Sequence, residues 1–300
     1  MRVVLGCGNF GGIGSSPAFF GQGETREQAF ELMDAAWAFG LRRFDTADAY
    51  GGGRSESWIG EWLRATGNRP EITTKTYNPM AEGADHGLSR DRVLRQAETS
   101  LDRLGVERID LYLAHEPDEE TPVAETARAL DELVAQGAAG AWGVSNVDGA
   151  GLREWLDAGE PAIVQNGYSL LERGDDADVI PLCAERGIEY QAFSPLAGGW
   201  LTGKYRRGEE APVGSRMTMR PEPYRHLEND TIFDGLEAFE AAAAGRGVSS
   251  GGLALAWALG GAGSVVVGPR SPRHLHCVGE ALSLELSPAE RDEVGSFFPC

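Results

Sequence analysis

The sequence predicts a single α/β domain of the TIM-barrel class, in which parallel strands alternate with helices. Three observations predict this class: eight short apolar runs recur along the 300 residues, segments with helical periodicity lie between them, and no proline- or serine-rich linker divides the chain. A TIM barrel commonly uses about 250 residues as one unit. We therefore expect residues 1–300 to form one barrel domain rather than an open doubly wound sheet.

The expected strands are short and rich in β-branched or aromatic residues, as strands usually are. They cover residues 2–6, 42–46, 71–75, 109–115, 141–146, 162–166, 188–194 and 264–268. Helical periodicity predicts helices at residues 25–40, 89–105, 121–137 and 231–247. Thr25 and Ser89 suit N-cap positions, and four glycines stand where helices should stop, at Gly40, Gly105, Gly137 and Gly187.

Residues 198–230 follow the seventh expected strand and are rich in Gly, Arg and Pro. We expect them to form a long loop without regular structure at the C-terminal face of the barrel, where the strands end. Loops of such length are usually functional or mobile. The segment is therefore expected to contribute to a site at that face.

The composition excludes several function classes. A formal charge of −19 repels nucleic acid and anionic lipid, so an anionic ligand must be held by a few local donors. The cysteines are far apart and follow no secretory signal, which predicts reduced thiols in a cytoplasmic protein; they are Cys7, Cys183, Cys277 and Cys300. No apolar run is long enough to cross a bilayer.

Polar side chains stand at the carboxyl ends of five expected strands, where TIM barrels place their working residues. The strand ends carry Asp45, Lys75, His115, Ser145 with Asn146, and Gln165 with Asn166, and we expect all of them to point into one mouth. Each alone has a plainer explanation, such as a turn or cap for an aspartate and a structural hydrogen bond for a histidine. Together they predict catalysis.

One chain of groups has a defined chemistry. A buried carboxylate keeps a neighbouring lysine charged, and that ammonium lowers the pKa of a nearby phenol. Asp45, Lys75 and Tyr50 supply these groups, and lysine occurs in this chain only at Lys75 and Lys204. We therefore expect Tyr50 to exchange a proton near the working pH.

Six fragments, in this order and spacing, resemble the signatures of the aldo-keto reductase family: "DTADAYGGGRSE", "TTK", "HEPD", "GVSN", "QNGYSLLER" and "FSPLAGGWLTGKY". The resemblance runs from Gly6 to about residue 281. It implies a catalytic tetrad of Asp45, Tyr50, Lys75 and His115. Tyr50 would donate a proton to a carbonyl oxygen during hydride transfer from NADPH, and His115 would orient that carbonyl.

The same resemblance implies a cofactor site. Ser145, Asn146 and Gln165 would bind the nicotinamide carboxamide, and Phe193 would stack on its ring. The turn after the seventh strand would receive the pyrophosphate, with Ser194, Leu196 and Gly198. The adenosine 2'-phosphate would meet Gly268, Arg270, Ser271 and His274.

The chain departs from the family at Cys277 and Val278, where a Glu-Asn pair often contacts adenine. NADP is thus the expected cofactor, with NAD as the open alternative. Phe10, Phe19, Phe20, Tyr77 and Trp200 are candidate walls of the substrate pocket, although scattered aromatic residues are more often core.

Two other function classes remain open, and one glycine-rich motif has a structural explanation. The barrel and its nicotinamide site can serve a regulatory subunit or redox sensor, which would not need the whole tetrad. A metal-dependent hydrolase needs several ligands at strand ends, and only Asp45 and His115 qualify. The "GGGRSE" run lacks the spacing of a phosphate-binding loop, which favours a turn into a helix, with Glu56 as a structural ion pair or helix cap. The sequence leaves the substrate, the direction of reaction and the oligomeric state undetermined.

Overall fold

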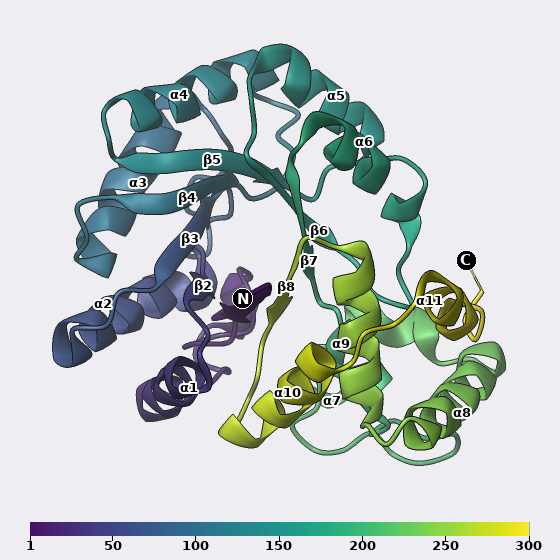
Figure 1. The fold of residues 1–300 in the computed structure, drawn as a ribbon. Coiled ribbons are helices and arrows are strands. Elements are labelled where there is room, and N and C mark those ends of the chain that lie inside the picture. The colour runs from purple at the N-terminus through teal and green to yellow at the C-terminus, as the bar shows by residue number, and fades with distance from the viewer. Residues whose placement is uncertain (300) are drawn as a thin grey trace.

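The computed structural model describes residues 1–299, and in it eight parallel strands close into a barrel in chain order, β1 to β8 (Figure 1). The strands are β1 Val3–Gly6, β2 Arg43–Asp45, β3 Glu71–Thr76, β4 Ile109–Ala114, β5 Ala139–Ser145, β6 Ile163–Gly167, β7 Glu189–Phe193 and β8 Ser264–Val267. The barrel closes where Val3 of β1 pairs with Val265 of β8. The predicted fold class is confirmed.

Helices cover the outside of the barrel (Figure 1). They are α1 Arg26–Phe39, α2 Arg54–Thr66, α3 Arg90–Leu104, α4 Val123–Ala135, α5 Gly149–Ala158, α6 Val179–Arg186, α7 Arg216–Met219, α8 Asp230–Gly245, α9 Ser250–Gly261, α10 Leu275–Ser283 and α11 Pro288–Gly295. Short 3-10 turns η1 to η6 cover Pro17–Phe19, Tyr50–Gly53, Gly174–Asp176, Ala197–Thr202, Glu222–Leu227 and Pro272–His274.

The helix ends follow local chemistry. Thr25 forms a capping box with Gln28 at the start of α1, as expected, while Ser89 holds the N-cap position of α3 without a side-chain bond. Gly40, Gly105 and Gly187 end α1, α3 and α6 in the left-handed conformation. These local signals explain why the helix boundaries were predictable.

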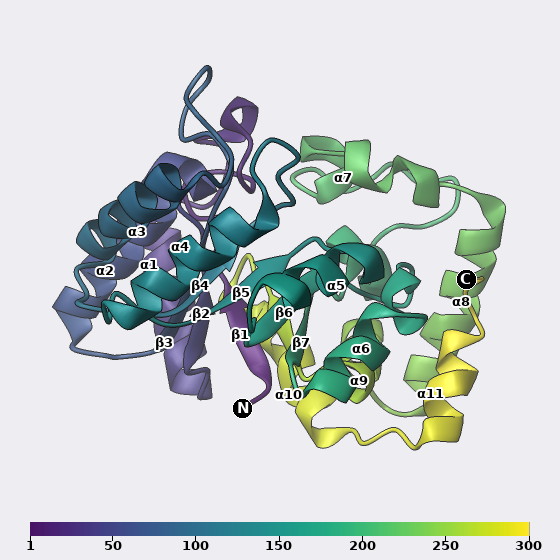
Figure 2. The same cartoon turned by 90° about the horizontal axis from the view of Figure 1, so that it is seen from above.

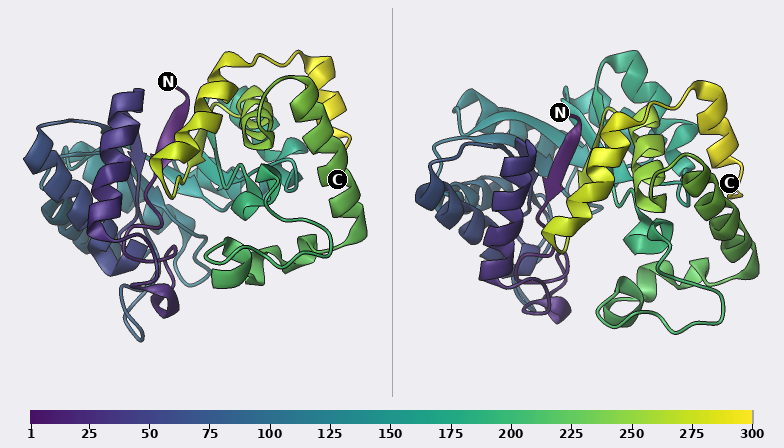
Figure 3. Two further views of the ribbon diagram at one scale, coloured as in Figure 1. Left: turned by 90° about the horizontal axis from the view of Figure 1, so that it is seen from below. Right: turned by 60° about the horizontal axis from the view of Figure 1, so that its bottom comes forward.

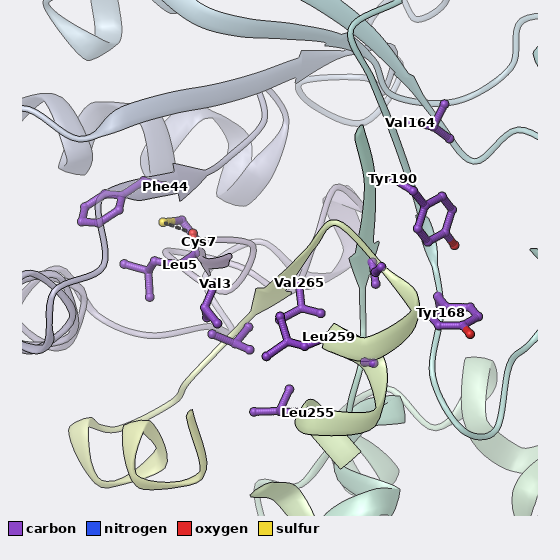
Figure 4. Close-up of a cluster of buried hydrophobic side chains, with 14 of the residues drawn as sticks. Val3, Leu5, Cys7, Phe44, Val164, Tyr168, Tyr190, Leu255, Leu259 and Val265 are labelled. Carbon is purple, nitrogen blue, oxygen red and sulfur yellow. Dashed lines mark hydrogen bonds between the residues drawn. The ribbon is translucent and has the colours of Figure 1, made fainter. Parts of the chain in front are cut away.

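The apolar core continues from the strands to the helices that cover them. Val3 and Leu5 of β1 lie beside Val265 of β8, and Leu255 and Leu259 of α9 pack over them (Figure 4). Helix α9 is buried on nearly every side, which suits its almost wholly apolar sequence "SGGLALAWALGG". Among residues 1–299, no helix combines the length and hydropathy that a transmembrane span requires.

The segments that follow β1, β3 and β7 gather on one side of the barrel, opposite the N-terminus (Figure 2). Both views of Figure 3 place the segment with α7 on that same side. The expected long segment after β7 does lie at this face, but residues 198–230 are not without regular structure, because α7 and η5 lie within them and η4 overlaps their start. Arg216 of this segment donates to Asn9 Oδ1, and Arg220 lies 3.5 Å from Ile13 O, so the segment is tied to the loop after β1.

Candidate active site

Four side chains from the ends of β2, β3 and β4 and from η2 form one hydrogen-bonded chain at the barrel mouth. Lys75 Nζ donates to Asp45 Oδ1 at 2.7 Å, to the Thr46 carbonyl at 2.8 Å and to Tyr50 Oη at 3.3 Å. Tyr50 Oη lies 3.5 Å from His115 Nε2. The structure thus brings together the four residues that the sequence predicted as a tetrad.

The backbone after β2 places Tyr50 at this position. Thr46 N and Asp48 N bond to the carbonyls of Thr73 and Lys75, which keeps the segment against β3 beyond the end of the strand. The backbone then turns through Gly51, whose φ is +60° and where a Cβ would lie 2.5 Å from Phe10 O. Only glycine fits this turn, which leads directly into α2.

Burial and charge set the protonation of these groups. Burial lowers the pKa of Lys75, but the charge of Asp45 and the bonds to Asp45 and Tyr50 outweigh burial and raise it above the ordinary value. Burial, assisted by Lys75, lowers the pKa of His115 well below its usual range. At neutral pH the lysine is therefore charged and the imidazole neutral.

Tyr50 differs from the sequence-based expectation of a pKa near the working range. Burial raises the pKa of its phenol, and this effect exceeds the lowering by the charge and hydrogen bond of Lys75. The phenol therefore holds its proton in this state of the protein. A protonated Tyr50 is suited to donate that proton rather than to remove one.

Three predicted nicotinamide ligands lie beside the tetrad. Gln165 Nε2 donates to Asp45 Oδ2 and to Gln191 Oε1, each at 2.7 Å. Asn146 has a φ of +58° and donates to the His115 carbonyl at 2.9 Å and to Ser145 Oγ at 3.2 Å. No donor among residues 1–299 is bonded to Gln165 Oε1 or Asn146 Oδ1, so two amide oxygens are left for a ligand.

Asn166 does not point into the mouth, contrary to the expectation. Its Oδ1 accepts from Val147 N at 3.1 Å, and its Nδ2 donates to Val147 O and to Asp175 Oδ2, each at 2.7 Å. Successive strand residues face opposite sides of a sheet, and Gln165 takes the inner side. Asn166 therefore holds the β5 and β6 loops together.

The turn after β7 combines strained backbone with small residues. Ser194 and Ala197 have φ values of +52° and +45°, which are costly for residues with a Cβ and are often found at functional sites. Phe193, Ser194, Leu196 and Gly198 are all half-buried, as a binding turn requires. Gly198 has a φ of +63°, and a Cβ there would lie 2.5 Å from the ring of Tyr224 in η5.

We expect Gly198→Ala to destabilise the protein by more than Gly208→Ala. Both glycines have a left-handed φ, but a Cβ at Gly208 meets nothing within 4 Å. The strain alone costs about 1–2 kcal/mol, and the clash with Tyr224 adds to it. Urea denaturation of both variants measures the difference. Equal losses would show that Tyr224 does not pack on the turn.

The residues after β8 include Arg270, which is close enough to Lys204 to lower its pKa. Arg270 Nε is 2.6 Å from Glu24 Oε1, and its Nη1 donates to the Gly214 carbonyl. His274 Nδ1 accepts from Arg270 N at 3.1 Å, and Ser271 Oγ is buried without a hydrogen-bond partner. Gly268 directly follows β8. The predicted residues are thus neighbours, but Arg270 is already paired with a carboxylate that is 3% exposed.

The sequence prediction missed two cations of this region, Lys204 and Arg216. Burial and the charges of Arg216 and Arg270 lower the pKa of Lys204, and burial likewise lowers that of Arg216. Lys204 Nζ lies over the glycine turn, 2.1 Å from where a Cβ on Gly199 would be. Lys204 thus places a positive charge beside the glycine turn, and Arg216 and Arg270 are near enough to repel it. The rarity of lysine was the available signal for Lys204.

The candidate aromatic walls divide into two groups. Phe10 and Trp200 are each 1% exposed and belong to the core, where Trp200 packs on Tyr205. Phe19, Phe20 and Tyr77 are half-buried near the mouth side. Only this second group has surface left for a ligand.

Other predictions concern thiols, adenine and metals. Cys7, Cys183 and Cys277 are free thiols, while Cys300 lies outside the described residues. Val278 is 1% exposed in the core, so it offers adenine no polar contact. Glu56 is buried and accepts from Thr74 Oγ1 at 2.6 Å and Arg103 at 3.1 Å, as a structural residue does. Residues 1–299 contain no group of three or more His, Cys, Asp or Glu that could hold a metal ion.

Comparisons with known proteins show the family of this chain. The model of the aldo/keto reductase family matches residues 2–297. The NADH-specific methylglyoxal reductase of Escherichia coli is 32% identical, over 95% of this chain and 91% of that protein. A probable voltage-gated potassium channel subunit beta of Oryza sativa is 33% identical, over 79% of this chain and 76% of that protein. The structure of the glycerol dehydrogenase of Gluconobacter oxydans aligns with a TM-score of 0.84 at 27% identity, covering 99% of this chain and 90% of that one.

The closed parallel (β/α)8 barrel and the family match define a class of barrel oxidoreductases. The chain belongs to the aldo/keto reductase family, and it is an oxidoreductase enzyme. Members of this family are generally NAD(P)H-dependent carbonyl reductases. The family assignment made from the six sequence fragments is confirmed.

Proposed function

We propose that this protein transfers a hydride between a nicotinamide cofactor, in the first place NADPH, and a small aldehyde, ketone or sugar, with Tyr50 as the proton donor. The observation that carries the proposal is the chain Asp45–Lys75–Tyr50–His115, in which a charged lysine and a neutral imidazole flank one protonated phenol. The same site serves the reverse reaction on an alcohol, with Tyr50 accepting the proton.

The residues at the mouth fit a dinucleotide. Two amide oxygens beside the tetrad, the strained turn at Ser194 and Ala197, the unpartnered Ser271 Oγ and the cations Lys204 and Arg216 are suited to a carboxamide at one end and phosphates at the other. When bound, the reduced nicotinamide supplies the hydride for the carbonyl carbon. Gln165, Asn146 and Ser145 would hold its carboxamide, and Phe193 would pack against its ring.

The chain's own residues manage the proton. Tyr50 Oη gives its proton to the carbonyl oxygen, and Lys75, 3.3 Å away, stabilises the phenolate that results. Asp45 keeps Lys75 charged and in place, because its other oxygen is fixed by Gln165 at 2.7 Å. His115 is close enough to Tyr50 to contact the same carbonyl oxygen.

A panel of carbonyl compounds, followed by nicotinamide absorbance with NADPH and NADH, tests the proposal. Turnover with at least one aldehyde or ketone is expected. Methylglyoxal and glyceraldehyde are suitable first substrates, because relatives are named for methylglyoxal and glycerol. Cofactor binding without any turnover would favour the regulatory interpretation, to which the channel-subunit relative corresponds.

A substitution at Arg270 tests the cofactor preference. We expect Arg270→Ala to weaken NADPH binding about tenfold. This loss is near the lower end of the free energies that hydrogen bonds to charged groups contribute. The effect is modest because Glu24 already pairs with the guanidinium at 2.6 Å. NADH, which lacks the 2'-phosphate, should lose much less affinity. Fluorescence titration of both cofactors at fixed salt measures the two losses.

Glu24→Gln is the matched variant, since it keeps the side-chain shape and removes the charge that competes for Arg270. It should tighten NADPH binding and leave NADH binding nearly unchanged. If both cofactors lose affinity equally in Arg270→Ala, Arg270 does not select NADPH, and the proposed preference for NADPH then has no residue behind it.

We also propose that the barrel is one domain working in the cytoplasm. The free thiols of Cys7, Cys183 and Cys277 support this location, because disulfides are rare in reducing compartments.

A further inference from the structure

Asn78 contacts the edge of the His115 imidazole that is turned away from Tyr50. Its Nδ2 lies 3.4 Å from His115 Nδ1, while the opposite ring nitrogen, Nε2, lies 3.5 Å from Tyr50 Oη. Asn78 comes three residues after Lys75, just beyond β3, and no sequence motif marked it. It therefore has direct access to the nitrogen that the tetrad does not use.

Both partners of this contact are held by their backbones. Arg92, which is 2% exposed, donates to the Asn78 carbonyl at 2.8 Å and to Thr76 Oγ1 at 2.7 Å. His115 N donates to the Thr76 carbonyl at 3.0 Å, and Asn146 donates to the His115 carbonyl at 2.9 Å. Hydrogen bonds thus hold the backbones on both sides of the contact between Asn78 and the imidazole.

A neutral imidazole carries one proton, and its partner decides which nitrogen holds it. The amide Nδ2 of Asn78 is a donor, so His115 Nδ1 must accept and the proton stays on Nε2. His115 Nε2–H then donates to Tyr50 Oη, as Lys75 Nζ also does. An oxygen that accepts two hydrogen bonds leaves its own O–H free to point elsewhere.

The other tautomer would have the opposite effect. With the proton on Nδ1, the bare Nε2 would accept the O–H of Tyr50, and the proton needed by the substrate would be bound inside the protein. The placement of the proton on His115 therefore determines whether Tyr50 can act as an acid.

We propose that Asn78 is a positioning residue that holds His115 in its Nε2–H tautomer and so keeps the Tyr50 hydroxyl proton available to the carbonyl oxygen. This inference rests on the proposed function. In the reduction, a C–H bond forms with the hydride from the reduced nicotinamide, and an O–H bond forms with the proton from Tyr50. The Tyr50 phenolate is left with Lys75 and His115 Nε2–H as donors, and solvent returns its proton afterwards.

Asn78→Asp tests the proposal, because it preserves the size of the side chain and replaces the donor by acceptors. Lys75 is the charged group that acts on the pKa of His115, and it remains in this variant. Nitrogen-15 NMR of histidine-labelled protein distinguishes the Nε2–H tautomer, the Nδ1–H tautomer and the doubly protonated imidazolium. His115 is assigned among the five histidines by the signal lost in His115→Asn.

The expected result is an Nε2–H signature in the parent and a proton on Nδ1 in Asn78→Asp, with kcat reduced about tenfold or more. The dissociation constant of the nicotinamide cofactor should stay within about twofold. A purely structural role of Asn78 would not change the tautomer and kcat while leaving cofactor binding intact. Asn68→Asp, which adds the same charge on the loop after α2, is the control and should keep the parent's tautomer and kcat.

An Nδ1–H signature in the parent overturns the proposal, and so does an Asn78→Asp variant with unchanged tautomer or unchanged kcat. The parent spectrum needs no turnover, so it decides the tautomer even if no carbonyl compound is reduced. Absence of turnover in the parent would instead count against the proposed function.

Discussion

Tyr50→Phe is expected to lower kcat by about a hundredfold or more, the usual range for loss of a general acid. The substitution removes one oxygen, and that oxygen is the atom 3.3 Å from Lys75 Nζ and 3.5 Å from His115 Nε2. The ring remains, so the mouth keeps its shape. Steady-state kinetics with the best carbonyl substrate, together with a cofactor titration, separates loss of chemistry from loss of binding.

Tyr112→Phe provides the matched control. Its phenol oxygen is buried in the barrel wall without a hydrogen-bond partner, so its removal should change neither kcat nor folding. Near-normal turnover in a correctly folded Tyr50→Phe variant would place the proton donor elsewhere. An equal loss of kcat in both variants would mean that the loss is not specific to the Tyr50 oxygen.

Lys75→Met is expected to reduce both activity and stability. Lys75 is fully buried and is the cation that pairs with Asp45 at 2.7 Å, so its loss leaves a buried carboxylate unpaired, at a cost of about 3–5 kcal/mol. The phenolate form of Tyr50 also loses its stabilising charge, which should lower kcat about a hundredfold. Urea denaturation and steady-state kinetics measure the two effects.

Adding Asp45→Asn to Lys75→Met separates the two losses. The double variant buries no unpaired charge, so much of the stability should return while kcat stays low. Recovery of kcat with stability would show that Lys75 acts only through folding. Full activity of the single variant across the pH range would make Lys75 peripheral to catalysis.

The fold and the tetrad were predictable because their signals are local. Five strands end in or beside a polar residue, which a barrel places at one face, and the glycine run after Tyr50 predicts a turn whatever the rest of the chain does. The alternation of side chains along a strand could have excluded Asn166 from the site, since Gln165 and Asn166 are successive strand residues and only one of them can face inward.

The other differences come from tertiary structure. Arg270 pairs with Glu24, 246 residues away, and no local pattern announces such a contact. The pKa of Tyr50 is raised because burial exceeds the effect of Lys75, and the depth of burial is not readable from the "DTADAY" segment. Helix α7 spans only Arg216–Met219, too few residues to show periodicity.

The two lysines of this chain differ in access to reagents, since Lys75 has a fully buried side chain and Lys204 is exposed beside the glycine turn. Acylating or reductively methylating reagents will therefore modify Lys204 and the terminal amine first. A carbon-13 methyl label on Lys204 would report the arrival of an anion at the turn. Conversely, amine coupling to a sensor chip would attach the protein through Lys204 at the glycine turn, so immobilisation through a terminal tag is the suitable format for binding measurements.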